Sequence, residues 1–593
     1  MLFFITGAVL GWGFWGILPK SINNSLKHLI CPSIGLFLFT ELNIFSSFIF
    51  GVGIVSILIS FFFEVLISIL AFRFFKPSFG LEKIPILFIL PALVIVLATS
   101  YIFYSQVLFP TPAGLKAGGG GVWGDTALHI AYSSRLETGE FPPQNPLFAG
   151  KTLVYPYAND LLSTVLRIGG LGVNLAFILP QVIFLISALA LFYSFARKFT
   201  EDTGFLISLV LIIFGWGIGS IYFLKGPLIW PPSLEYTNNP DFKLYMHNLF
   251  TGLILPERSF LPGLFLGFLI FVNFYHFLES GERKTLILNG FLAGALPFWH
   301  THTFIFIVIS FVIFGLYLIY QDIRINIKPL LLSAGAAFLI AAPFLALFLK
   351  NQEAESFIRL IGGWQIQGEN FFIFWFRNSF LIIPLALAGF WKFKKTLGIY
   401  FAGAFLTFLI ANIIAFQPWE WDNIKLFSWA FIFFAVLSGI WLSSLFQKNY
   451  FYKIAVIILA VTSSFSGILS ITKQISSKYT LYDKSDIELA DWAKENTGID
   501  EVFLVEPIPN HPVPGLAGRL VYLGYPGHLW VHGVDWSKRE SLNAQVIGGD
   551  LEQVKMAEVT ISYVVLPKGS VFKPEDLASV FSNDKYIVIK ARS

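Results

Sequence analysis

Charged residues are scarce in this sequence. Asp, Glu, Lys and Arg make up 13% of its 593 residues, whereas soluble domains carry about 25%. The scarcity is confined to residues 1–472, where apolar runs follow one another. This excludes a soluble fold for most of the chain. We predict a polytopic α-helical membrane protein (1–472) followed by a small soluble α/β domain (473–593).

Other features are also missing. The single cysteine, Cys31, excludes an internal disulfide and a Cys-rich metal site. The net charge of +4 is spread over many short loops, which argues against nucleic-acid binding. No repeats or duplicated halves are visible, and duplicated halves are typical of many transporters.

Long apolar runs are abundant instead. A membrane span needs about 20 apolar residues. We predict fourteen spans, at 2–18, 33–50, 51–72, 84–105, 174–196, 205–224, 259–277, 286–299, 303–320, 329–349, 372–391, 397–416, 425–446 and 454–472.

Basic residues predict the orientation of these spans. The short connections on one side each carry at least two Lys or Arg residues, namely 19–32, 73–83, 197–204, 278–285, 321–328, 392–396 and 447–453. Cytoplasmic loops are enriched in Lys and Arg. We therefore place the loop at 106–173, the loops at 225–258, 350–371 and 417–424, and the tail outside the cytoplasm.

The first external loop contains the longest polar stretch of the apolar region, residues 121–160. Asp125 and His129 are four residues apart and would share a helix face. Asp125 could take a proton from an acceptor hydroxyl, or it could cap a helix that begins at Thr126. We expect His129 to be a hydrogen-bonding or packing residue rather than a metal ligand. Tyr155 and Tyr157 could stack on a sugar, or they could be interfacial aromatic residues.

Glu257 and Arg258 lie where a second external loop returns to the membrane. Arg258 could hold a lipid phosphate, because its guanidinium group offers a planar fork of donors. The alternative is a pair of charged side chains that reach back toward the membrane surface.

His300 and His302 interrupt an apolar stretch. Two residues apart, they do not share a helix face, so we expect the helix to break there. We interpret them as a polar wall of an active cavity, with packing or a metal site as alternatives. A zinc site needs further ligands that the spacing does not identify.

A fourth cluster, in QPWEWDNIKLF, combines Trp419, Glu420, Asp422 and Lys425. As a donor or acceptor site, it would place Lys425 near a phosphate and Trp419 or Trp421 against a sugar. As a structural feature, it would be an aromatic belt with solvated charges.

The tail alternates one helical pattern, DIELADWAKENTG, with four strand patterns. His511, Arg519, His528, His532 and Asp535 fall in its predicted loops. They could belong to a lid over the membrane site or to a compact, turn-rich domain.

With its many spans, its large first external loop bearing an acidic residue and its soluble tail, the chain resembles the GT-C class of membrane glycosyltransferases. The segment FPPQNPLFAGKTLVYPYAND is similar to a loop of the "YYY" bacterial and archaeal membrane proteins, which are grouped with that class. The resemblance implies an external cavity, a polyprenyl-phosphate sugar donor and transfer with inversion. It maps the loop carboxylate of the class onto Asp125.

Two features depart from the class. Four apolar segments precede the loop, where the class usually has one, and the loop has GDT, where many members have paired acids. The lack of a paired-acid motif favours a metal-free base over a bound divalent metal, so we expect no cofactor.

The sequence therefore predicts an enzyme of the plasma membrane. It would move a sugar from a polyprenyl-phosphate donor to a glycan, lipid or protein acceptor at the external face. A transporter or flippase, or a non-enzymatic envelope assembly protein, are the alternatives.

Overall fold

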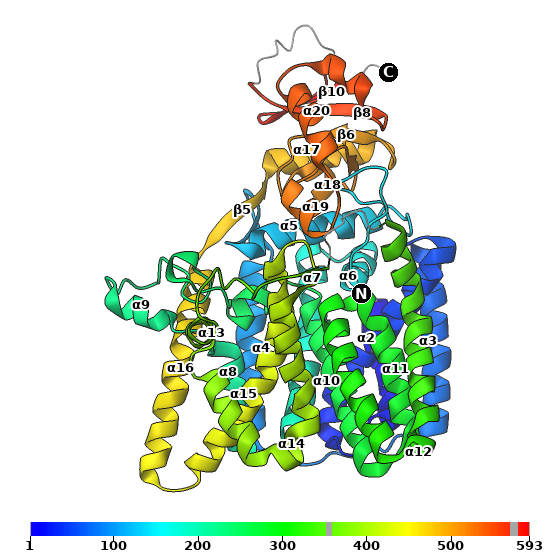
Figure 1. The fold of residues 1–593 in the computed structure, drawn as a ribbon. Helices are drawn as coiled ribbons and strands as arrows, with labels where there is room; N and C mark the ends of the chain where they lie inside the picture. Colours follow the sequence, from blue (N-terminus) through cyan, green and yellow to red (C-terminus); the bar gives the residue numbers. More distant parts are fainter. Residues whose placement is uncertain (1, 352–357, 570–578, 592–593) are drawn as a thin grey trace.

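The computed structural model describes residues 2–351, 358–569 and 579–591. Residues 352–357, which belong to the predicted loop 350–371, and residues 570–578 and 592–593 of the predicted tail domain lie outside the described residues. A bundle of long helices carries a smaller part, made of strands and short helices, at one of its ends (Figure 1).

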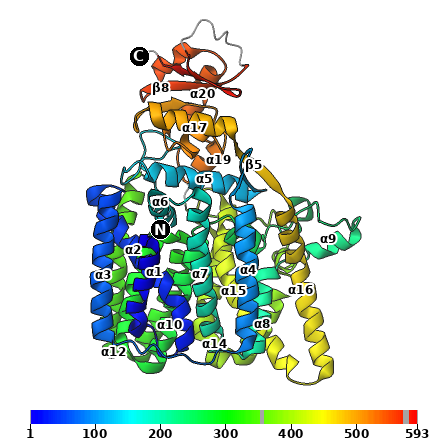
Figure 2. The same ribbon diagram turned by 180° about the vertical axis from the view of Figure 1, so that it is seen from behind.

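The N-terminal helices lie together at one flank of the bundle (Figure 2). They are α1 (Leu2–Leu10), the 3-10 helix η1 (Gly11–Ile17), α2 (Asn24–Phe50) and α3 (Ile54–Phe75). A Cβ atom on Gly11 would lie 1.9 Å from the Cys31 carbonyl oxygen, and one on Gly35 would lie 2.0 Å from that of Gly7. Small residues thus let these helices pack closely, as is common in membranes.

The remaining long helices follow in chain order. They are α4 (Ile86–Gln106), α7 (Val173–Ala196), α8 (Asp202–Phe214), α10 (Phe260–Ser280), α11 (Arg283–Trp299), α12 (Thr301–Asn351), α14 (Ile382–Ile413), α15 (Ile424–Phe446) and α16 (Tyr450–Ser476). Helix α12 holds two candidate spans, because the backbone is not helical at Asp322. Two short helices, α9 (Gly219–Lys225) and α13 (Phe371–Ser379), bend by 64° and 97° against α8 and α14.

Within the described residues, nine helices are long and apolar enough to cross a membrane, or up to 11 if each bent pair forms one span. Each of the fourteen predicted spans contains helix. Three of them fall short of a full span here: residues 2–17 are split between α1 and η1, α11 has 17 residues, and the predicted span 397–416 corresponds to the shorter apolar helix Gly398–Ile413. The polytopic helical fold agrees with the prediction, and the count of fourteen stays a prediction.

The predicted first external loop forms its own substructure above the bundle. It contains the hairpin β1 (Phe109–Thr111) and β2 (Gly114–Gly118), then α5 (Gly121–Leu136) and α6 (Ala158–Ile168). Strand β2 also pairs with β5 (Lys478–Asp483) of the tail, so that a single three-stranded sheet joins the two segments. The loop 225–258 adds the short helices η2 (Pro240–Phe242) and η3 (Phe250–Ile254).

The tail contains a five-stranded sheet in the order β7-β6-β8-β10-β9. Its strands are β6 (Val502–Leu504), β7 (Leu520–Val521), β8 (Ile561–Pro567), β9 (Ser579–Ser582) and β10 (Tyr586–Lys590), and its helices are α17 (Lys484–Asn496), α18 (Pro512–Gly515), α19 (Pro526–Val531) and α20 (Ser537–Ile547), with the 3-10 helix η5 (Leu551–Met556). Strand β6 is parallel to β7 and β8, whereas β10 is antiparallel to β8 and β9. Alternate residues of the central strands, such as Phe503, Val565 and Val588, pack on α17.

Hydrogen bonds from backbone amides and from two arginine side chains connect the tail to the first loop. The Ala149 amide donates to the Val521 carbonyl at 2.9 Å, and the Gly524 amide donates to the Leu147 carbonyl at 2.7 Å. Arg135 donates to the Ile499 carbonyl at 2.6 Å, and Arg539 donates to the Ala149 carbonyl at 3.0 Å. Within the tail, α19 lies on the side that faces the helical bundle (Figures 1 and 2).

Candidate active site

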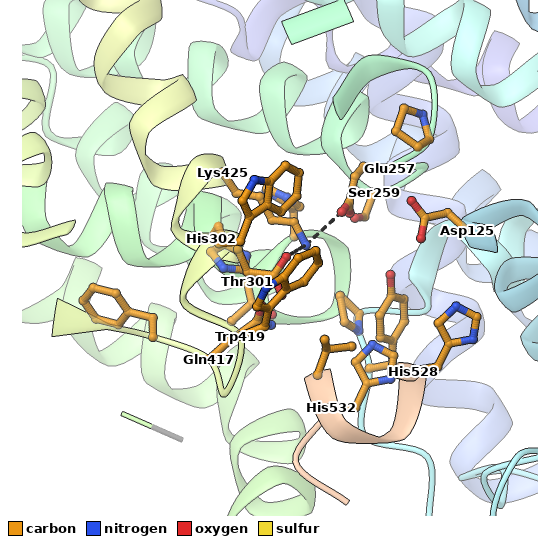
Figure 3. A pocket seen from close by; sticks show the side chains of 18 of the residues that line it. Asp125, Glu257, Ser259, Thr301, His302, Gln417, Trp419, Lys425, His528 and His532 are labelled. Atoms are coloured by element: carbon orange, nitrogen blue, oxygen red, sulfur yellow. Dashed lines mark ion pairs between the residues drawn. The ribbon is translucent and has the colours of Figure 1, made fainter. Parts of the chain in front are cut away.

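A cavity of about 980 Å³ lies between the bundle, the first loop and the tail. Its wall takes residues from α5, the segment 154–156, the loop 225–258, the junction of α11 and α12, the segment 416–425 and the tail segment 525–532. Figure 3 shows side chains from these separate parts of the chain pointing toward one another. The sequence analysis singled out thirteen residues of the membrane region as functional or as neighbouring aromatics. Ten of them line this cavity: Asp125, His129, Tyr155, Glu257, His300, His302, Trp419, Trp421, Asp422 and Lys425.

Asp125 projects from α5 into the cavity (Figure 3). The helix begins at Gly121 after Gly120, whose φ is 64°, so Asp125 stands in the second turn. The alternative that it caps a helix beginning at Thr126 is therefore wrong. Burial is the main cause that raises the pKa of Asp125 to about 7, and the negative charge of the nearby Glu257 carboxylate is the second. A carboxyl group with such a pKa can accept a proton near neutral pH.

His129 joins the cavity wall to a buried ion-pair network behind it. Its Nδ1 lies 2.9 Å from Asp160 Oδ2, and Arg258 Nε lies 3.3 Å from Asp160 Oδ1. Arg258 also donates to the Ser163 hydroxyl at 2.6 Å and lies over the Phe177 ring, with Cζ 3.6 Å from the ring centroid. The expectation that His129 makes hydrogen bonds is confirmed.

The structure does not bring Arg258 to the cavity. The side chain is 3% exposed and its guanidinium group is held by Asp160. The alternative that the Arg258 side chain reaches back toward the membrane surface is therefore wrong. Its buried position outside the cavity lining also gives no support to a contact with a lipid phosphate. Asp160 lies in α6, and its carboxylate forms a buried ion pair with Arg258. The two residues are far apart in the sequence, so local sequence does not reveal this contact.

Lys425 is surrounded by carboxylates. Its Nζ lies 2.8 Å from Glu257 Oε1 and 3.3 Å from Asp422 Oδ1, and Figure 3 marks the pair with Glu257 by a dashed line. Burial acts to raise the pKa of Glu257, but the attraction of Lys425 outweighs it, and the pKa lies below its usual value. Glu257 is therefore ionised, and it contributes to the raised pKa of Asp125.

Aromatic rings form another part of the wall. Trp419 and Trp421 are stacked with ring centroids 5.0 Å apart, and Trp530 of α19 approaches Trp419 at 6.4 Å. Tyr155 lines the cavity, whereas Tyr157 is buried against Phe141 and Phe298 and does not line it.

Glu420 is also absent from the cavity lining. Its Oε1 accepts a hydrogen bond from Gln365 Nε2 at 2.9 Å. The structure thus places Tyr157, Arg258 and Glu420 outside the wall of the cavity, although the sequence grouped them with residues that line it.

His300 and His302 lie at the junction of two helices, as predicted. Helix α11 ends at Trp299 and α12 begins at Thr301, and His300 has extended backbone angles (φ −161°, ψ 100°). Both imidazoles line the cavity, and their exposed fractions are 2% and 5%. The break turns both side chains toward the cavity, which a continuous helix would not allow for residues two apart.

The tail contributes two further histidines. His528 and His532 line the cavity from α19 and its C-cap (Figure 3). His532 Nδ1 also lies 3.2 Å from the Tyr132 hydroxyl. Burial lowers the pKa of His528 to about 4 and that of His532 to about 3, so both are neutral at pH 7. The other tail residues singled out in the sequence, His511, Arg519 and Asp535, do not line the cavity.

Some lining residues were not predicted from the sequence. Asn238, Tyr245 and His247 enter from the loop 225–258, and Tyr525 and Trp530 enter from the tail. The density of aromatic residues and histidines in these two segments is a usable signal, but their distance in sequence from Asp125 hides the contact. Among the residues that the structure describes, no three His, Cys, Asp or Glu side chains come together in a group that could hold a metal ion.

Comparison with known proteins finds similar solved structures. No family model and no curated protein matches the chain. The apo crystal structure of the Archaeoglobus fulgidus oligosaccharyltransferase is 12% identical, with a TM-score of 0.49, over 80% of this chain and 69% of that one. The crystal structure of ArnT from Cupriavidus metallidurans bound to undecaprenyl phosphate is 11% identical, with a TM-score of 0.43, over 85% of this chain and 98% of that one.

A third structure shows the archaeal oligosaccharyltransferase AglB from Archaeoglobus fulgidus with an inhibitory peptide and a dolichol-phosphate; it is 13% identical, with a TM-score of 0.41, over 81% of this chain and 69% of that one. At such identities the function has to be argued from the residues of the cavity. The structural neighbours are membrane glycosyltransferases of the GT-C class, the class that the sequence resembles.

Proposed function

We propose that the protein is a membrane glycosyltransferase that moves a sugar from a polyprenyl-phosphate donor to an acceptor at the external face of the membrane. The observation that carries the proposal is the composition of the cavity of about 980 Å³. It combines a carboxyl group whose pKa lies near 7, a row of aromatic rings and an apolar wall at the junction with the bundle.

Asp125 is the proposed general base. The acceptor hydroxyl oxygen attacks the anomeric carbon of the donor sugar while the bond from that carbon to the phosphate oxygen breaks. Asp125 takes the hydroxyl proton, and the polyprenyl phosphate leaves with the electron pair of the broken bond. Attack from the face opposite the leaving group inverts the configuration at this carbon.

The wall of the cavity provides for both parts of such a donor. Phe304, Ile305, Phe344 and Phe348 line it from the two halves of α12 and supply an apolar surface for the prenyl chain. Trp419, Trp421 and Trp530 lie at the tail side, where aromatic faces can pack against a sugar ring. In the proposed orientation, the lipid chain of the donor lies along α12 and its sugar points toward the tail.

The ion pairs around the cavity have supporting roles in this proposal. Lys425 balances Glu257 and Asp422, and Arg258 and Asp160 hold His129 in position. We propose that the reaction needs no metal ion, because Asp125 acts directly on the acceptor. We further propose fourteen spans, with the cavity and the tail outside the cytoplasm of a plasma membrane.

The test is sugar transfer by purified protein in lipid bilayers. A panel of undecaprenyl-phosphate-linked sugars, radiolabelled in the sugar, is supplied with solubilised envelope material as the acceptor source. We expect Asp125→Asn to lower transfer by about 10²- to 10⁴-fold, the usual contribution of a general base. Asp535→Asn, an exposed substitution in the tail, is the matched control and should transfer at the wild-type rate. Wild-type transfer by Asp125→Asn would refute the catalytic role.

The pH profile gives a second readout of the same assignment. A base must be deprotonated, so kcat/KM should fall as the pH drops below about 7, the pKa to which burial and Glu257 raise Asp125. Removing the Glu257 charge with Glu257→Gln should move this acidic limb to lower pH. Chelation of divalent cations should leave transfer unchanged, and loss of transfer on chelation would refute the metal-free base.

A further inference from the structure

The cations near the cavity are already paired. Lys425 lies between Glu257 and Asp422, and the guanidinium group of Arg258 is held by Asp160 outside the lining. Asp125, Glu257 and Asp422 outnumber Lys425 among the charged residues of the lining. A phosphate in this cavity therefore requires a further hydrogen-bond donor.

His300 has such a donor, and its neighbours determine which ring nitrogen carries the proton. The Thr303 backbone amide lies 3.2 Å from His300 Nδ1 and donates to it, so Nδ1 is an acceptor. The Thr303 hydroxyl lies 2.7 Å from the same Nδ1, and its oxygen accepts from Trp429 Nε1 at 2.8 Å, which leaves its hydrogen for Nδ1. In a neutral imidazole with Nδ1 as acceptor, the hydrogen is on Nε2.

The Nε2–H group is buried and has no hydrogen-bond partner in the protein. Buried donors are satisfied in the great majority of cases, because an unmade hydrogen bond costs about 1–3 kcal/mol. His300 lines the cavity and is 2% exposed. An unpartnered donor at this position indicates a ligand atom that accepts a hydrogen bond.

The location of His300 suggests which atom this is. His300 immediately precedes α12, whose next lining residues include Phe304 and Ile305 on the apolar wall. The amino end of a helix also attracts negative charge. A group at His300 is thus anionic or polar and adjoins an apolar chain, which is the chemistry of a lipid phosphate.

We propose that His300, through its Nε2–H, is the residue that binds the phosphate of the polyprenyl donor and stabilises the charge that this phosphate gains when the sugar leaves. This inference rests on the proposed function, and it assigns the phosphate to the start of α12 rather than to Arg258. Thr303 and Trp429 are positioning residues, because they act through Nδ1 of the imidazole.

Two substitutions separate the donor from the helix cap. His300→Asn keeps a side-chain oxygen near the place of Nδ1, where it can still accept from Thr303, but it has no donor near the place of Nε2. His300→Gln is longer and brings an amide donor close to that place. His276→Asn and His276→Gln are the matched controls. His276 lies near the C-terminal end of α10, where it pairs with Glu282, and it does not line the cavity.

Binding of undecaprenyl phosphate, without a sugar, to the protein in nanodiscs is the direct assay, with undecaprenol as the uncharged comparison. We expect His300→Asn to weaken undecaprenyl phosphate binding at least about tenfold and to leave undecaprenol binding unchanged. His300→Gln should restore much of the affinity, and both His276 variants should bind like the wild type. In transfer assays, His300→Asn should raise KM for the donor and lower kcat as well.

The outcomes separate this inference from the proposed function. If His300→Asn binds undecaprenyl phosphate as the wild type does, the inference is overturned, even if transfer falls. If both ligands weaken equally, His300 supports the cavity shape and not the phosphate, which also overturns it. If wild-type protein transfers no sugar from any donor while phosphate binding depends on His300, the function fails and the phosphate site stands.

Discussion

At the scale of single residues, the role of each charge depends on its partner. Arg258 suits a phosphate by chemistry, yet Asp160 and Ser163 hold it inside the protein. Lys425 and Asp422 are three residues apart, so their pairing follows from helix geometry. The shorter contact of Lys425 with Glu257 connects segments more than 160 residues apart and could not be predicted from spacing.

The buried pair of Arg258 and Asp160 leads to a stability prediction. Arg258→Met leaves Asp160 without its guanidinium partner in a buried position, and we expect a loss of about 3–5 kcal/mol. Thermal unfolding in detergent should show a clearly lower Tm. The double variant Arg258→Met with Asp160→Asn should recover part of this loss, because it removes the unpaired charge. An unchanged Tm with a raised KM for the donor would instead support a phosphate contact for Arg258.

At the scale of elements, the start of α5 shows how packing changes a local expectation. Residues 118–121 are all glycine, and glycine disfavours helix by about 1 kcal/mol relative to alanine. The helix nevertheless begins at Gly121, where β2 ends against β5 and Trp123 Nε1 donates to the Thr480 carbonyl at 3.1 Å. The tail thus helps to set the position of Asp125.

The pairing of β2 with β5 can be tested at Gly114. Its φ is 129°, and a Cβ atom there would lie 2.1 Å from the Tyr482 carbonyl oxygen, a backbone atom that cannot rotate away. We expect Gly114→Ala to separate the tail from the loop, to increase the rate of proteolysis of the tail and to lower transfer. Gly170→Ala has a similarly positive φ of 87° with no atom within 4 Å. Equal proteolysis of the two variants would show that backbone strain alone, and not the strand pairing, is responsible.

At the scale of the whole molecule, the first loop and the tail lie at the same end of the bundle (Figure 1). The cavity is lined by residues of both segments. The charge pattern predicts that this end faces away from the cytoplasm. The assignment of this end to the external side of the membrane rests on the charge pattern alone.

Orientation can be measured by labelling single cysteines. Cys31 is buried and is first replaced by Ser. Glu552→Cys introduces an exposed thiol in the tail, and Lys284→Cys introduces one in a predicted cytoplasmic loop. We expect a membrane-impermeant maleimide to label intact cells at 552 and not at 284, and both positions after permeabilisation. The reverse pattern would place the cavity in the cytoplasm and rule out an external reaction.

The sequence by itself determined the membrane-embedded helices, the break at His300 and most of the segments that meet at the cavity. Hydropathy and charge act locally along the chain, and for that reason they are readable without a structure. Only the tertiary structure decided which charges are paired, which side chains line the cavity and which nitrogen of His300 is free. Those properties depend on atoms brought together from segments hundreds of residues apart, and on the burial that makes each pairing strong.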